Sequence, residues 1–306
     1  MGEPASGSMV RTAFIGLGSM GGALARRAVA AGHTCTIYDI DPAKRASFSS
    51  QARVADSLSD AVVDAAIVVA CLVTADQYEE VLFGAGGLAS ARHPLTYVHA
   101  GTSSVPKARD WAKRLAPSDI AFVDAPVTGG PARAEAGDLV VMASGAQDAF
   151  ARAEPLLNSY ARKVIYLGET PGSAQMMKLT NNMLNFSNLA AAAEILVIGT
   201  KAGLDPEKML EVINEGSGQN SATLAKFPQH ILTGTFDYRG WISHVLKDGK
   251  AFLDEAADMT VPAPLSAAVY QAFVEAFAAG DERDDYDITE VIRHMEKAAG
   301  VEVRRR

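Results

Sequence analysis

Short apolar runs alternate with longer amphipathic segments over the first half of the chain. Strands are expected at 10–15, 33–38, 65–72, 95–99, 120–124, 139–143 and 164–167. Helical segments, such as 23–31 and 105–115, lie between them. Strands that alternate with helices favour a mostly parallel sheet that is covered on both faces. The first half of the chain therefore predicts an α/β domain.

From residue 171 onward the pattern shows helical periodicity alone. Helices are expected at 171–203, 205–215, 219–226, about 241–258, 263–279 and 286–299. The first of these is rich in Ala, Leu and Met and has no internal proline after its start. We therefore expect three parts: a disordered extension at 1–8, a dinucleotide-binding α/β domain at 9–170, and an all-helical domain at 171–306. The long helix joins the two domains.

One polar stripe runs along this otherwise apolar helix. Its members are spaced i, i+3, i+4 and i+7 and so share one face: Lys178, Asn181, Asn182 and Asn185. A buried lysine beside three amides must face something polar. The stripe is either a structural hydrogen-bond network or the lining of a site.

A glycine-rich turn, Gly16-Leu-Gly-Ser-Met-Gly21, stands between the first predicted strand and a helix. In such turns the glycines allow a tight bend, close approach to a pyrophosphate and helix–strand packing. The helix N-terminus adds free N–H groups for the phosphates. Asp39 closes the next strand, where an acid can accept ribose hydroxyl groups. In this context the motif predicts dinucleotide binding.

A second glycine-containing loop follows the predicted strand 120–124. Thr128, Gly129 and Gly130 expose backbone N–H groups and one hydroxyl. The loop follows a parallel strand, and the carboxyl ends of such strands are where ligands bind in open α/β sheets. Such a loop suits an anion such as a carboxylate. Because paired glycines also mark ordinary turns, the loop alone leaves both interpretations open.

Composition narrows the classes of partner and compartment. The net charge of −8 over 306 residues, without a basic cluster, argues against nucleic acid. No apolar run appears long enough to span a bilayer, so no membrane partner is expected. The two cysteines, Cys35 and Cys71, exclude a disulfide framework and favour a reducing, cytoplasmic location. The scattered histidines lack metal-ligand spacing, so no metal site is expected.

Taken together, four motifs resemble those of the β-hydroxyacid dehydrogenase family, which includes 3-hydroxyisobutyrate dehydrogenase and tartronate semialdehyde reductase. The resemblance covers about residues 9–300, and its motifs are Gly16–Gly21, Asp124–Gly130, Gly172–Asn182 and Lys247-Asp248. It implies a Rossmann-type N-terminal domain and an all-α C-terminal domain joined by the long helix. It also implies a small carboxylate substrate, a nicotinamide cofactor, and a homodimer or homotetramer.

The resemblance also implies roles for individual residues. Lys178 would be the catalytic acid/base, with Asn182 as its orienting or substrate-binding partner. Thr128, Gly129 and Gly130 would hold the substrate carboxylate. The cofactor would be bound by Gly16, Leu17, Gly18, Ser19, Met20, Gly21, Asp39, Leu72, Val73, Thr102 and Lys247.

Three positions depart from the family pattern. The family usually has serine where Thr128 stands, so the added methyl group tightens the pocket. Leu72-Val73 stands where leucine-proline is frequent, and Gly249 where leucine is common. These changes affect the expected substrate rather than the expected reaction.

The chain is therefore expected to interconvert a small 3-hydroxy acid and its 3-oxo acid. Asp39, with no arginine at the next two positions, favours NAD over NADP, although Lys44 and Arg45 a turn further on weaken that preference. Two alternatives stay open: an imine reductase-like enzyme and a non-catalytic dinucleotide-binding scaffold protein. Lys178 discriminates against both, since imine reductases generally lack it and a scaffold protein would be expected to have lost it.

Overall fold

The computed structural model describes residues 10–280 and 286–305, which form two compact units. The first unit ends at Lys178 and the second begins at Leu179. The extension expected over residues 1–8 lies outside the described residues. The domain boundary predicted between residues 170 and 171 falls shortly before this division and stays a prediction.

The first unit is built on a mostly parallel sheet, as the sequence predicts. Its described strands are β1 (Thr12–Ile15), β2 (Cys35–Tyr38), β3 (Arg53–Val54), β4 (Ile67–Ala70), β5 (Leu95–His99), β6 (Ile120–Asp124), β7 (Val127–Thr128), β8 (Leu139–Gly145) and β9 (Ala161–Tyr166). They lie in the order β3-β2-β1-β4-β5-β6-β8-β7, with β9 paired to β8. Strand β8 runs antiparallel to β6 and to β7, and the other pairs of described strands in the sheet are parallel. The short strands β3 and β7 are additions to the predicted set.

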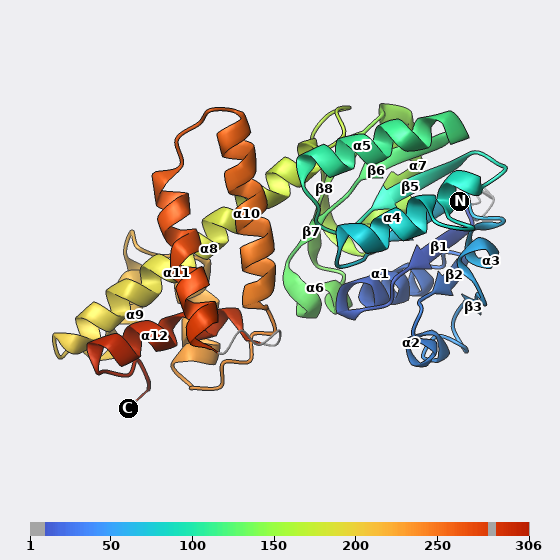
Figure 1. Ribbon diagram of the computed structural model, residues 1–306. Helices are drawn as coiled ribbons and strands as arrows, with labels where there is room; N and C mark the ends of the chain where they lie inside the picture. The colour runs from blue at the N-terminus through green and yellow to red at the C-terminus, as the bar shows by residue number, and fades with distance from the viewer. Residues whose placement is uncertain (1–9, 281–285, 306) are drawn as a thin grey trace, which may run out of the picture. The chain divides into compact units, whose positions relative to one another are not determined.

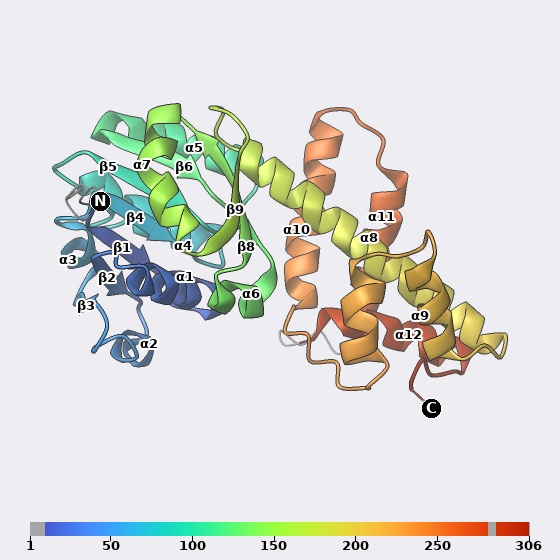
Figure 2. The same cartoon turned by 180° about the vertical axis from the view of Figure 1, so that it is seen from behind.

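Helices cover both faces of this sheet (Figures 1 and 2). They are α1 (Ser19–Ala30), α2 (Pro42–Ala46), α3 (Leu58–Val62), α4 (Ala75–Phe83), α5 (Val105–Leu115), α6 (Gly130–Ala136) and α7 (Gln147–Asn158), with short 3₁₀ turns at Leu88–Ser90 and Ala116–Ser118. Phe14 of β1 packs into the core formed with α1 and α7. Its neighbours Ala13 and Ile15 enter the core formed with α3, α4 and α5. This alternation is what a strand covered on both faces requires.

The strand order reverses between β1 and β4. The chain first adds β2 and β3 on one side of β1, and then β4, β5 and β6 on the other. Ile15, the last residue of β1, accordingly pairs with Tyr38 of β2 and with Ala70 of β4. In open α/β sheets, ligands bind outside the carboxyl ends of the strands at such a reversal. The fold therefore directs attention to the loops that follow β1 and β4.

The regular elements described in the second unit are helices, as predicted. Its elements are most of α8 (Ser173–Lys201), α9 (Pro206–Glu215), the π-helix η3 (Ala222–Ile231), α10 (Ile242–Asp258), α11 (Pro264–Ala279), the 3₁₀ turn η4 (Ile288–Glu290) and α12 (Val291–Ala299). Leu189, Leu196 and Phe273 lie in its core and are fully buried. A π-helix of 10 residues is unusual, because most are single-turn bulges. The sequence predicts an ordinary helix there.

Helix α8 corrects one expectation about membranes. It is long and apolar enough to cross a bilayer by length and composition, which the sequence analysis did not anticipate. Half of its most apolar window is buried inside the fold, as in the core helix of a folded domain. It is not buried all round, however: Leu184, Ile195 and Ile198 are exposed along one face.

Candidate functional site

The turn after β1 has a backbone that requires glycine. Gly16 adopts a φ of +87°, and a Cβ atom there would lie 2.6 Å from the Cys71 carbonyl oxygen. Its N–H donates to the Tyr38 carbonyl oxygen at 2.9 Å. At Gly21, a Cβ atom would lie 2.0 Å from the Gly16 carbonyl oxygen, so α1 packs directly against the turn. Close contacts within the protein therefore require glycine at positions 16 and 21.

Gly18 is different, because no contact within the described chain requires a glycine at this position. It caps α1 with an ordinary φ of −62° and is exposed together with Ser19. No atom of the described chain lies within 4 Å of a Cβ built at this position. Glycine here leaves room for a ligand to approach the backbone at a helix N-terminus. The turn therefore fits the pyrophosphate of a dinucleotide.

Asp39 is buried and joins β2 to this turn. Its Oδ2 accepts the Leu17 N–H at 2.6 Å, and its Oδ1 accepts the Asp41 N–H at 2.9 Å. Each carboxylate oxygen has a second lone pair, so both can also accept hydroxyl donors. Arg45 lies over the Tyr38 ring at 5.7 Å and donates to the Asp56 carbonyl oxygen at 3.5 Å. The Asp39 carboxylate thus holds the turn in place and can also accept hydrogen bonds from the hydroxyl groups of a ribose.

The remaining predicted cofactor residues of the first unit follow neighbouring strands at the same edge of the sheet. Leu72 and Val73 follow β4, and Thr102 lies in the turn after β5. The Leu72 N–H donates to the hydroxyl of buried Tyr78 at 2.8 Å, and Val73 is exposed. Met20, in the first turn of α1, packs partly against the core. The loop after β4 lies close to Gly16, and the turn after β5 lies close to Leu72.

The predicted anion loop lies where β7 leads into α6. Thr128 ends β7 and is partly buried. Gly129 and Gly130 have φ values of +137° and +79°, a region that favours glycine. A Cβ atom on Gly129 would lie 3.0 Å from Leu139 Cδ2, whereas one on Gly130 would meet nothing in the described chain within 4 Å. The loop therefore combines a constrained glycine, an open glycine and one hydroxyl.

The polar stripe of α8 is bonded to other elements of the second unit. Asn182 Nδ2 donates to Asp248 Oδ2 at 2.8 Å, and Asn181 donates to Asn182 Oδ1 at 3.4 Å. The buried Asp248 carboxylate also has the ammonium of Lys247 at 3.6 Å, on the same helix α10. Lys178 itself is partly buried on α8 at the end of the first unit. The stripe is thus a real network, and it includes the pair of residues that the resemblance singles out.

A buried lysine that the sequence analysis did not identify completes this network. Lys226 of η3 is only 2% exposed, and its Nζ donates to Asn185 Oδ1 at 2.8 Å. Ser221 donates to the same oxygen at 3.3 Å, and the Tyr238 ring lies 5.0 Å from the ammonium. Burial lowers the pKa of Lys226 to about 8. The hydrogen bond with Asn185 is what identifies Lys226 as part of the network. The two residues lie far apart in the sequence, so their spacing does not predict this bond.

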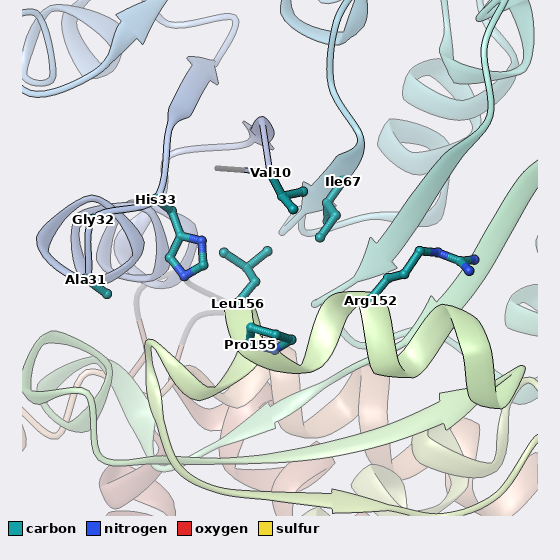
Figure 3. Close-up of a pocket in the computed structure, with 8 residues that line it drawn as sticks. All are labelled: Val10, Ala31, Gly32, His33, Ile67, Arg152, Pro155 and Leu156. Atoms are coloured by element: carbon teal, nitrogen blue, oxygen red, sulfur yellow. The ribbon is translucent and has the colours of Figure 1, made fainter. Parts of the chain in front are cut away.

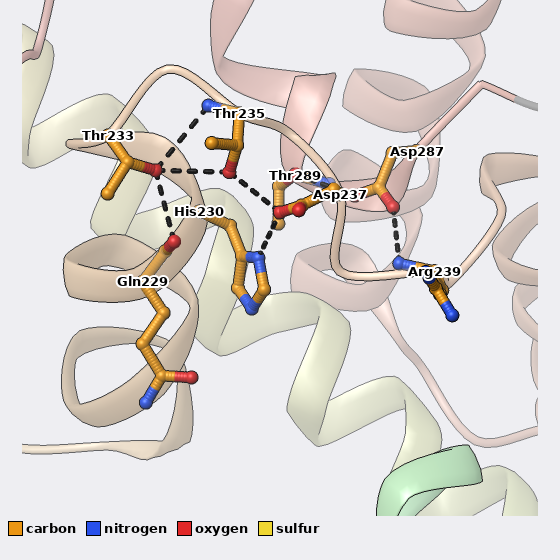
Figure 4. Close-up of polar contacts among 8 residues, drawn as sticks. All are labelled: Gln229, His230, Thr233, Thr235, Asp237, Arg239, Asp287 and Thr289. Carbon is orange, nitrogen blue, oxygen red and sulfur yellow. Dashed lines mark hydrogen bonds and ion pairs between the residues drawn. The ribbon is translucent and has the colours of Figure 1, made fainter.

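The loop before α10 is also fixed by polar contacts, which Figure 4 shows. His230 and Thr235 both bond to Asp237 Oδ1 at 2.6 Å. The backbone N–H of Arg239 donates to Asp287 at 2.7 Å. Phe236 and Arg239 have positive φ values of 50° and 63°, so these contacts hold a strained segment. That segment leads into the helix that carries Lys247 and Asp248.

Asp124 and Gln175 are two further buried polar residues, which lie within two of the sequence motifs but were assigned no role from the sequence. Gln175 Nε2 donates to Asp124 Oδ1 at 2.6 Å, and the Gln175 N–H donates to Asp124 Oδ2 at 3.2 Å. Burial raises the pKa of Asp124 to about 7, although the hydrogen bonds from Gln175 and from the Gly172 backbone act to lower it. Both residues are fully buried.

A small hollow lies at the opposite edge of the sheet, near the starts of β1 and β4. Figure 3 shows His33, Pro155 and Leu156 lining it. Arg152, which also lines it, bonds to Asp148 at 2.8 Å and to Thr96 at 3.2 Å. None of the predicted site residues lies there. Among residues 10–280 and 286–305, no group of three or more His, Cys, Asp or Glu side chains could hold a metal ion.

Comparisons with known families agree with this two-part arrangement. Residues 11–168 match the NAD-binding domain of 6-phosphogluconate dehydrogenase. Residues 172–295 match a model described as NAD-binding of NADP-dependent 3-hydroxyisobutyrate dehydrogenase. Together the two matches account for nearly all of the described chain.

Individual relatives are similar over most of their length. The chain is 35% identical to the L-threonate dehydrogenase of Cupriavidus necator, over 89% of this chain and 92% of that protein. It is 34% identical to the 2-(hydroxymethyl)glutarate dehydrogenase of Eubacterium barkeri, over 96% and 97%. The crystal structure of a 3-hydroxyisobutyrate dehydrogenase from Salmonella typhimurium superposes with a TM-score of 0.83 at 30% identity, covering 93% of this chain and 99% of that one.

The raised pKa of Asp124 predicts a specific dependence of stability on pH. Between about pH 4 and pH 7 the folded protein retains a proton at Asp124 that the unfolded chain releases. The free energy of unfolding should therefore fall as pH rises through this window, relative to Asp124→Asn, by an amount on the order of 4 kcal/mol at most.

Urea unfolding of both proteins from pH 4 to pH 8 measures this difference. Between about pH 4 and pH 7 the unfolding free energy of the unmodified protein should fall relative to that of Asp124→Asn. Above about pH 7 the two curves should run parallel. Parallel curves over the whole range would contradict the assignment of the raised pKa to Asp124.

Proposed function

Because the chain belongs to the β-hydroxyacid dehydrogenase family, we propose that it interconverts a small 3-hydroxy acid and the matching 3-oxo acid, with NAD preferred over NADP. The observation that carries this proposal is the polar stripe of α8. It presents Lys178 and Asn182 on one face, and the Asn182 amide is held by buried Asp248. A lysine at position 178 supplies a proton-transfer group that a protein binding only a dinucleotide does not require.

Lys178 is assigned the proton transfer. Oxidation of the alcohol requires removal of its hydroxyl proton, and reduction of the carbonyl requires its return. A nicotinamide cofactor, when bound, would supply the hydride acceptor or donor. The Lys178 amine takes the proton from the hydroxyl oxygen, and the lysine stem is partly shielded from water on α8.

Asn182 is assigned the orientation of the reacting hydroxyl. Its Nδ2 donates to Asp248, so the amide cannot rotate freely and its oxygen faces a fixed direction. One helical turn separates it from Lys178, which places both side chains on the same stretch of the helix face. Lys247, next to Asp248, adds a positive charge on α10 that suits the cofactor or the substrate carboxylate.

The substrate carboxylate is assigned to Thr128, Gly129 and Gly130. The two glycines have positive φ values and carry no side chain over the loop, so their N–H groups are candidate donors, and the Thr128 hydroxyl adds one more. The names of the relatives support this substrate class, because L-threonate and 2-(hydroxymethyl)glutarate are both hydroxy carboxylates. The cofactor is assigned to the turn Gly16–Gly21, with Asp39 accepting the ribose hydroxyls.

We further propose a cytoplasmic homodimer or homotetramer. The exposed apolar face of α8, formed by Leu184, Ile195 and Ile198, supports a contact between copies of the second unit. Both cysteines are free thiols, which suits a reducing compartment.

The cofactor preference is tested by steady-state kinetics with NAD and NADP. The Asp39 carboxylate accepts two hydroxyls and repels a 2′-phosphate, so kcat/KM should be higher with NAD. Asp39→Asn should narrow the difference, because the amide carries no charge. A tenfold preference of the unmodified enzyme for NADP would contradict the proposal.

The anion loop is tested with Thr128→Val, which keeps the shape of the side chain and removes its hydroxyl. A hydrogen bond to a charged group is worth about 1.5–3 kcal/mol, so KM for the acid should rise about ten- to hundredfold. Thr128→Ser retains the hydroxyl and serves as the matched control. Equal turnover of the acid and its methyl ester by the unmodified enzyme would count against a carboxylate at this loop.

The role of Lys178 is tested with Lys178→Ala. The variant should lose roughly a hundred- to ten-thousandfold in kcat, while NAD binding measured by fluorescence is retained. Lys178→Arg should not restore activity, because arginine stays protonated. Lys201→Ala, at the other end of the same helix, removes an exposed lysine and should leave kcat unchanged. A folded Lys178→Ala variant with near-normal kcat would falsify the assignment.

A further inference from the structure

Three segments of the first unit meet at one buried amide side chain, that of Gln175 in the first turn of α8. Its Nε2 donates to Asp124 Oδ1 at 2.6 Å and to the Gly101 carbonyl oxygen at 3.1 Å. Its Oε1 accepts the Ser103 N–H at 2.9 Å. The amide thus ties α8 both to the end of β6 and to the turn that contains Thr102.

Asp124, the last residue of β6, is the second member of this junction. Its Oδ2 accepts the backbone N–H of Gln175 at 3.2 Å, so the carboxylate lies at the positive end of a helix of 29 residues. The groups that bond to it are donors, namely the side chain and backbone of Gln175 and the backbone of Gly172. An amide at position 124 would turn its own NH₂ group toward one of these donors. The site therefore requires a side chain with two accepting oxygens, as aspartate has and asparagine has not.

The turn after β5 is held on its other side as well. Ser103 Oγ lies 3.2 Å from Nε2 of His99, which is fully buried. The His99 ring packs edge-on against the Tyr78 ring, with 4.4 Å between the ring centroids. The anchors of Gln175 are therefore rigid, and they fix the first turn of α8 relative to the sheet.

This anchor lies on the same helix face as the proposed catalytic residues. Gln175 precedes Lys178 by one turn and Asn182 by two turns, at spacings i, i+3 and i+7. A helix is stiff over this length, so the rotation and axial position that are set at Gln175 are also those of Lys178.

We propose that Asp124 and Gln175 are positioning residues for the reaction: they fix the rotation and axial position of α8 and so hold the Lys178 amine in line for proton transfer. This inference rests on the proposed function, in which Lys178 is the general acid/base. Asp124 and Gln175 touch neither substrate nor cofactor in this assignment and act through Lys178.

Ser144 provides a matched control within the same helix terminus. Its Oγ accepts the Ala174 N–H at 3.1 Å and is fully buried, so it also satisfies an N-terminal donor of α8. No bond joins Ser144 to Gln175 or to the turn Gly101–Ser103 among the contacts of the described chain. Ser144→Ala therefore weakens the helix end without releasing the Gln175 junction.

The test is a double-mutant cycle at saturating NAD and hydroxy acid. Asp124→Asn and Gln175→Met are each made alone and together with Lys178→Ala. A displacement of about 1 Å can cost about a hundredfold in rate, so each single variant should lower kcat about ten- to hundredfold. KM for the acid should stay within about threefold, because the anion loop is untouched. In the Lys178→Ala background, neither change should lower kcat by more than about twofold.

Each alternative outcome overturns a defined part of the argument. A full further loss of kcat in the Lys178→Ala background, or an equal loss in Ser144→Ala, would show that these residues act as general structural supports. A change in KM with normal kcat in Asp124→Asn or Gln175→Met would also show that these residues do not position Lys178. Near-normal kcat in Lys178→Ala alone would remove the proposed function, and this inference with it. If Asp124→Asn does not fold, Gln175→Met carries the cycle, since it keeps the backbone cap.

Discussion

The carboxylate of Asp124, buried beneath the first turn of α8, is the constraint on which the placement of the proposed catalytic residues depends. Burying a carboxyl group is costly unless hydrogen-bond partners surround it, and here the donors come from Gln175 and the helix terminus itself. Because these donors belong to α8, satisfying the carboxyl oxygens also fixes where the helix begins. The strand end that opens the predicted anion loop therefore also locates the helix that carries Lys178.

The cofactor side of the proposed site follows from sheet topology. Strand order reverses between β1 and β4, so the loops after these strands lie at the edge where ligands bind in such sheets. Gly16 and Gly21 are required by the protein, whereas Gly18 leaves space that the described chain does not fill. Only the last of these points to a ligand. The space around each glycine agrees with the separate roles that the motif gives them, namely a tight bend, close approach of a ligand and helix–strand packing.

Features set by local pattern could be predicted from the sequence, and features set by distant partners could not. The alternation of strands and helices, the change to helices alone and the stripe of α8 all follow from periodicity, and the structure confirms the fold class. The partners of the stripe are far apart in the chain: Gln175 bonds to Asp124 and Asn185 to Lys226. The sequence therefore gives no role to Asp124, although it lies in a quoted motif, and does not single out Lys226. The strand β7 has only two residues, too few to show an alternation. A helix is predicted at 219–226, but the pattern does not distinguish the π-helix η3 from an α-helix.

The distribution of polar groups along α8 explains how a mostly apolar helix acquires one orientation. Apolar packing is not directional, and a helix rich in Ala, Leu and Met could pack at several rotations with similar burial. Polar residues along α8 instead meet different elements in each unit. In the first unit Gln175 bonds to Asp124 at the end of β6, and in the second unit Asn182 bonds to α10 and Asn185 bonds to η3. Within either unit, rotating the helix would leave these donors and acceptors unpaired. Replacing Gln175 by an apolar residue would preserve a stable helix but remove the reason for its rotation in the first unit, and the Lys178 amine would lose its fixed direction.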